Sequence, residues 1–122
     1  NTIGSIYSTT TSTSFNTSSD YRLKENVTYD WNATSRLKQL KPARFNFIAE
    51  PDITVDGFLA HEAATICPES VTGTHNEVDD DGNAVMQGID QSKLTPLLTK
   101  ALIETVEKIE ALEARIAGLE SK

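Results

Sequence analysis

Hydrophobic residues in the last quarter of the chain recur with the spacing of one helix face. Between residues 94 and 120 they stand alternately four and three positions apart, which is the heptad pattern of a coiled coil. Pro96 suits the first turn of such a helix, because its missing N–H has no partner there. The pattern predicts a long helix over 94–120 whose seam is Leu98, Leu102, Thr105, Ile109, Leu112, Ile116 and Leu119.

Charges beside this seam predict the orientation of its partner. The g positions include Lys108 and Arg115, and the e positions include Glu113 and Glu120. A parallel assembly pairs Lys108 with Glu113 and Arg115 with Glu120, whereas an antiparallel one sets like charges together. The sequence therefore favours parallel self-association. Ile at a with Leu at d favours dimers, and a helix that folds back on its own domain stays an alternative.

Shorter elements are predicted in the middle of the chain. Asn32 is a candidate N-cap for a first helix that ends before Pro42. Alternation over residues 45–51 predicts a half-strand, and residues 58–66 read as a short helix stopped before Pro68.

Two turns complete this middle region. Asp56-Gly57 is interpreted as a turn. The acidic stretch 77–85 resembles a calcium loop in composition, but Ala84 stands where that loop requires glycine. A β-hairpin with Asp81-Gly82 as its turn explains the stretch more simply, so no metal and no cofactor is predicted.

Residues 1–18 differ from the rest of the chain. They hold eleven Ser or Thr and no charged side chain, and they cannot form a core alone. β-Branched and aromatic residues among them, including Ile6, Tyr7 and Phe15, suggest a β-type segment.

Composition limits the function further. A chain of 122 residues has room for one domain with a modest core, and its net charge of −7 argues against nucleic-acid binding. The single cysteine, Cys67, has no partner for an internal disulfide, which suits a reducing compartment. No run of about 18 apolar residues is present, so no membrane partner is expected.

Ser19 and Lys24 stand where the uncharged segment ends. A Ser–Lys pair is an alternative to Ser–His–Asp, provided that the lysine amine is neutral and can take the hydroxyl proton. By spacing alone the signal is weak. If residues 19–24 were helical, five residues would turn about 500° and leave the two side chains roughly 140° apart. The segment is therefore irregular, or Lys24 reaches Ser19 of another chain.

Longer motifs connect this pair to a known family. Residues 19–27 (SDYRLKENV), 40–45 (LKPARF), 57–62 (GFLAHE) and 88–94 (GIDQSKL) follow one another in order. Together they resemble the C-terminal intramolecular chaperone, or auto-processing, domain of phage tailspikes, tail fibres and endosialidases, of the peptidase S74 type. The chain departs from the family pattern at Val27, His61 and Gln91, where Ile, Gln and Tyr are usual.

The resemblance implies a mechanism. It assigns Ser19 as nucleophile, Lys24 as base, Asp20 and Arg22 as supporting residues, and the bond between Ser18 and Ser19 as the cleavage site. It also implies a homotrimer, contact with the upstream fibre or tailspike segment, and a location in the host cytoplasm during virion assembly, with release from the mature fibre after cleavage.

The expected fold is α+β, a small mixed domain with short helices and a β-hairpin. The expected parts are the end of a fibre stalk at 1–18, a chaperone core at 19–93 and a coiled-coil helix at 94–122. The predicted function is a self-cleaving chaperone that trimerises and registers a fibre. The alternatives are a permanent trimerisation or receptor-binding tip that never cuts and, least supported, a free hydrolase.

Overall fold

The computed structural model describes residues 3–122, and it divides the chain into two compact units. The first unit runs up to Trp31, and the second covers Asn32–Lys122. Each unit is described by itself.

A two-stranded antiparallel hairpin forms the start of the first unit. Strand β1 (Gly4–Ser8) pairs with β2 (Thr13–Thr17), and Ile6 faces Phe15 across the ladder. A short 3-10 turn, η1 (Tyr21–Leu23), follows. The described part of the segment 1–18 is therefore β-type, as predicted, whereas residues 1 and 2 of that segment lie outside the described residues. Its side chains are exposed, which agrees with the expectation that this segment builds no core alone.

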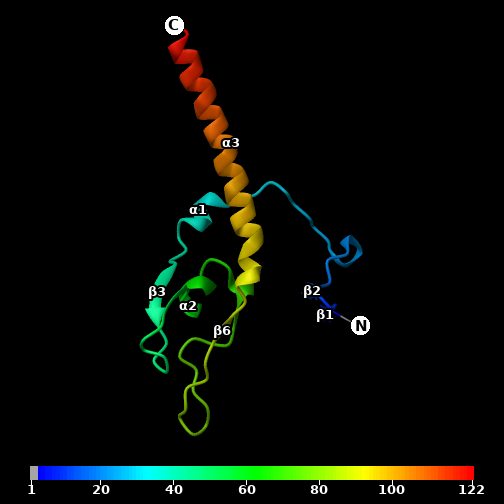
Figure 1. Cartoon of the computed structure of the whole chain (residues 1–122), viewed down its shortest axis with the longest axis vertical. Helices are drawn as coiled ribbons and strands as arrows, with labels where there is room; N and C mark the ends of the chain where they lie inside the picture. The colour runs from blue at the N-terminus through cyan, green and yellow to red at the C-terminus, as the bar shows by residue number, and fades with distance from the viewer. Residues whose placement is uncertain (1–2) are drawn as a thin grey trace. The chain divides into compact units, whose positions relative to one another are not determined.

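The second unit mixes short elements with one long helix (Figure 1). Two antiparallel pairs, β3 with β4 and β5 with β6, are joined to short helical segments. This is the mixed class that the sequence predicts. In chain order the elements are α1 (Thr34–Leu37), β3 (Ala43–Asn46), β4 (Thr54–Gly57), α2 (Ala60–Ala64), η2 (Pro68–Ser70), β5 (Val71–Thr72), β6 (Gly88–Ile89), η3 (Gln91–Leu94) and α3 (Thr95–Glu120).

Small side chains make up much of the core of this unit. The buried hydrophobic residues are Ala33, Ala63, Cys67, Leu94, Leu97 and Ala101. The one buried polar residue among residues 3–122 is Ser70, whose hydroxyl donates to the carbonyl of Cys67 at 2.6 Å. Burial of this hydroxyl is tolerated because its hydrogen bond is made inside the protein. The core therefore joins α1, α2 and the first two turns of α3.

Two local predictions need correction, and a third is confirmed. The first helix is only Thr34–Leu37, because the chain continues with i to i+3 turns before Pro42. Asp56-Gly57 is not a turn, since both residues end strand β4 and pair with Arg44 and Ala43. The acidic hairpin is confirmed, because Val78 and Ala84 form an antiparallel bridge around its turn.

Helix α3 matches the predicted range almost residue for residue. Its first turns pack on the unit, with Leu97 and Ala101 buried, whereas every residue from Thr105 onward is exposed. In Figure 1 the C-terminal half of α3 extends away from the other elements of its unit. Within residues 3–122 no helix has the length and hydropathy that a membrane span requires.

Candidate functional site

Ser19 and Lys24 contact each other within one chain. The Lys24 Nζ donates to the Ser19 Oγ at 2.7 Å, which is within the reach that proton transfer requires. The segment between them is irregular, and this was one of the two geometries that the sequence left open. The contact therefore needs no second chain.

The shape of the turn explains this contact. Only Tyr21–Leu23 are helical, and the residues on either side, Asp20 and Lys24, have extended backbones. The N–H of Lys24 donates to the carbonyl of Tyr21 at 3.1 Å and closes the turn. Because the helix stops after three residues, Lys24 leaves it in an extended direction and its side chain can return to Ser19. A continuous helix would carry the two side chains apart.

Hydrogen bonds between Asp20 and Arg22 stabilise the same turn. Asp20 Oδ1 accepts the backbone N–H of Arg22 at 2.9 Å, so the carboxylate caps η1. The guanidinium of Arg22 donates to both carboxylate oxygens, each at 2.9 Å. The side-chain bond with Arg22, aided by the backbone bond, lowers the pKa of Asp20, and the same pair raises the pKa of Arg22. Both groups are therefore charged and paired at neutral pH.

The residue before Ser19 is held by the hairpin. The N–H of Ser18 donates to the carbonyl of Ile3 at 2.9 Å, which continues the β1–β2 ladder by one step. The peptide bond between Ser18 and Ser19 thus joins a hydrogen-bonded strand end to a capped turn. Each side of this bond has a defined backbone.

Ser19 and Lys24 are both exposed in the single chain. Removing water from a lysine amine is one of the ways that proteins keep it neutral and able to act as a base. A neighbouring surface that covers Lys24 would supply this condition.

The predicted association residues lie together on α3. Exposed fractions of the Leu and Ile residues of the seam range from 42% at Leu112 to 66% at Leu119, so its own domain does not cover it. The residues that face the domain, Leu97 and Ala101, lie outside the heptad seam. The helix therefore has one face packed inside the chain and a separate apolar face that is exposed.

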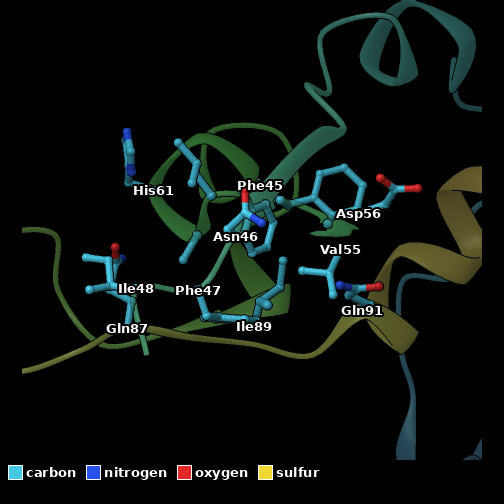
Figure 2. A pocket seen from close by; sticks show the side chains of 14 residues that line it. Phe45, Asn46, Phe47, Ile48, Val55, Asp56, His61, Gln87, Ile89 and Gln91 are labelled. Atoms are coloured by element: carbon cyan, nitrogen blue, oxygen red, sulfur yellow. The ribbon is translucent and has the colours of Figure 1, made fainter. Parts of the chain in front are cut away.

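An open groove lies in the C-terminal unit (Figure 2). This open groove has a volume of about 770 Å³. Its body is apolar, and Phe45 and Phe47 meet edge to face with ring centroids 5.3 Å apart. At one side His61 stacks on His75, with centroids 4.2 Å apart. The lining that the structure describes contains no serine, threonine, cysteine or lysine, so it offers no hydroxyl, thiol or amine side chain that could act as a nucleophile.

Sequence reasoning missed the part played by Glu104. From the middle of α3 its carboxylate accepts the N–H groups of Ala33 and Thr34, each at 2.8 Å. Asn32, the predicted cap, accepts the N–H of Ser35 at 3.3 Å, a longer bond. The separation in sequence hides this cap, because Glu104 by itself resembles any other glutamate on an exposed helix.

A serine hydroxyl beside a lysine amine is the arrangement that Ser–Lys peptidases use. Residues 19–72 match the family Peptidase_S74, described as chaperone of endosialidase. This segment of the chain is similar to that family, in agreement with the resemblance that its motifs carry. The match begins at Ser19 and ends before α3, so it covers less than half of the chain. No curated protein matches the chain significantly.

Proposed function

We propose that this chain is a self-cleaving intramolecular chaperone that trimerises and registers a phage tail fibre or tailspike, and then cuts itself off between Ser18 and Ser19. The observation that carries the proposal is the 2.7 Å contact between Lys24 Nζ and Ser19 Oγ at the first residue of the family match. The family description supports a chaperone role and peptidase activity in general terms. The cut site and the roles of the two residues are part of the proposal.

The chemistry is an acyl transfer followed by hydrolysis. Neutral Lys24 takes the proton of the Ser19 hydroxyl while Oγ attacks the carbonyl carbon of Ser18. The C–N bond then breaks, the proton passes to the leaving amine of Ser19, and the Ser18 acyl group is held as an ester on Oγ. Water cleaves this ester and leaves a carboxylate on Ser18 and a free hydroxyl on Ser19. The reaction consumes one water and needs no cofactor.

Association through α3 would prepare this site. The seam is exposed in the single chain, and burying one Leu or Ile side chain contributes about 1.5–3 kcal/mol. Because an isolated helix is marginal in water, partners that bury the seam also stabilise the helix. Parallel trimerisation aligns the upstream segments of three chains, and the neighbours then exclude water from Lys24. Cutting therefore follows correct assembly, in the host cytoplasm, and releases the domain from the fibre.

Freshly expressed protein tests the proposal directly. A denaturing gel should show a smaller fragment, and the intact mass of that fragment, measured by mass spectrometry, should correspond to a chain that begins at Ser19. Ser19→Ala and Lys24→Ala should remain full length and keep the oligomeric state of the parent. Lys24→Arg keeps the positive charge but cannot lose its proton, so it should also remain uncut. Cutting at the same bond in Ser19→Ala, or a parent that is oligomeric and never cut, would overturn the proposal.

The second candidate is a permanent trimerisation or receptor-binding tip. It shares the exposed seam of α3 but needs no chemistry at Ser19. The same gel separates the two, because only the self-cleaving chaperone produces a new N-terminus at Ser19.

A further inference from the structure

The ion pair between Asp20 and Arg22 spans the turn that separates Ser19 from Lys24. It makes three contacts of 2.9 Å, two of them from the guanidinium and one from the backbone N–H of Arg22. All three lie within residues 20–23, the connection between Ser19 and Lys24. No other ion pair between side chains is found in the described part of the first unit.

This pair is too exposed to hold the fold together. The Arg22 side chain is 76% exposed and that of Asp20 is 46% exposed. Ion pairs in such positions contribute little to stability, because water screens them and both side chains lose freedom when they pair. Its effect on the free energy of unfolding should therefore be small.

The contacts also argue against a direct chemical role for either group. Both carboxylate oxygens of Asp20 are engaged by Arg22, and the carboxylate remains ionised because the pKa of Asp20 is lowered. The charge of Arg22 is balanced by this carboxylate. Neither group is therefore free to take the proton of Ser19. What the pair does fix is the backbone that delivers Lys24 to Ser19.

We propose that Asp20 and Arg22 act as a paired positioning device for self-cleavage, which sets the turn so that Lys24 meets Ser19. This inference rests on the proposed function. A displacement of about 1 Å at a reacting group can cost on the order of a hundredfold in rate. An ion pair that contributes little to stability can thus still control the rate of cutting.

The test compares the rate of appearance of the Ser19 fragment in matched variants. Asp20→Asn retains an oxygen that can cap η1 but loses the charge, and Arg22→Gln loses the opposite charge. Each should slow cutting by roughly tenfold to a hundredfold. The double variant should be no slower than the slower single variant, because the two residues act as one unit. Arg22→Lys, which keeps the charge without the two-pronged geometry, should recover part of the rate.

A control pair is available elsewhere in the chain. Arg44 and Asp56 form a similar ion pair at 2.8 Å, with side chains 74% and 70% exposed, on strands β3 and β4. Arg44→Gln should cut at the parental rate. The oligomeric state and the unfolding midpoint should be unchanged in the Asp20 and Arg22 variants.

The pH profile separates positioning from proton transfer. If the pair only positions Lys24, the rate of cutting in Asp20→Asn falls at every pH and the shape of its profile stays parental. If the Asp20→Asn variant lost the fall in cutting rate at acid pH, Asp20 would be a proton acceptor in the parent protein. That result would overturn the inference. Parental rates in both single variants, or slow cutting that follows a loss of oligomer, would overturn it and leave the proposed function standing. A parent protein that assembles but never cuts would overturn both this inference and the proposed function.

Discussion

The carboxylate of Glu104 caps the backbone N–H of Ala33 at 2.8 Å, although 71 positions separate the two residues. The same carboxylate accepts the N–H of Thr34. The first N–H groups of a helix have no partner within it, and Ala33 is completely buried, so water cannot serve instead. This contact joins α3 to the start of α1.

Removing this cap should destabilise the C-terminal unit. Glu104→Ala leaves two N–H groups without acceptors and should lower the midpoint of thermal unfolding by roughly 4–8 °C. Glu104→Gln keeps an oxygen and should lose less. Glu110 is an exposed residue further along α3. Glu110→Ala is therefore the control and should unfold like the parent. Equal midpoints in all three variants would contradict the capping role.

The same carboxylate should make stability depend on acid pH. The N–H of Ala33 lowers the pKa of Glu104 below its ordinary value of 4.5. A carboxyl whose folded pKa is lowered contributes stability above its unfolded value, and this contribution is lost as pH falls through the folded value. Unfolding midpoints measured from pH 7 down to about pH 3 should therefore fall less steeply in Glu104→Gln than in the parent. Parallel curves would argue against this linkage.

The seam of α3 should couple assembly to cutting. Ile109→Asp places a charge in the seam and should yield a monomer that stays uncut, as judged by light scattering and a denaturing gel. Ile103 is a matched control, since it is 48% exposed and Ile109 is 49% exposed, but it lies outside the heptad seam. Ile103→Asp should assemble and cut normally. A monomeric Ile109→Asp that cuts at the parental rate would show that cutting does not need assembly.

Charges beside the seam should set the orientation of the assembled chains. In a parallel arrangement, Glu113→Lys places two lysines together by facing Lys108, and this should weaken association. Adding Lys108→Glu restores the opposite charges and should recover the parental midpoint of dissociation. Each pair contributes only a few tenths of a kcal/mol, so the shifts should be small and shrink at high salt. Glu107→Lys changes the charge away from the seam and should have little effect. A double variant weaker than either single one would contradict the parallel arrangement.

Cys67 should be a slow-reacting thiol in the folded protein. Burial, followed by the hydrogen bond that its thiol makes with Glu69, raises the pKa of Cys67, and the thiolate is the reactive form. Its side chain is 1% exposed. Alkylation at pH 8 should therefore be much slower in native protein than in denaturant. Fast stoichiometric labelling of the native chain would contradict the packing of η2 against η3, between which Cys67 lies buried.

The residues of the candidate site could be identified from the sequence. The motif around residues 19–27 identified Ser19 and Lys24, and the family match over 19–72 agrees with that recognition. Spacing could not say whether the two side chains meet. This depends on a turn of three residues, whose shape is fixed by the capping carboxylate of Asp20 and the guanidinium of Arg22.

By itself the sequence determined the long helix, because heptad spacing is a local property that needs no distant partner. Its predicted range of 94–120 is within one residue of Thr95–Glu120. Tertiary structure alone decided the cap of α1 by Glu104, the pairing that turns Asp56-Gly57 into a strand end, and the groove around Phe45 and Phe47. Each of these depends on residues far apart in the chain, whose contacts are made only when folding brings their elements together.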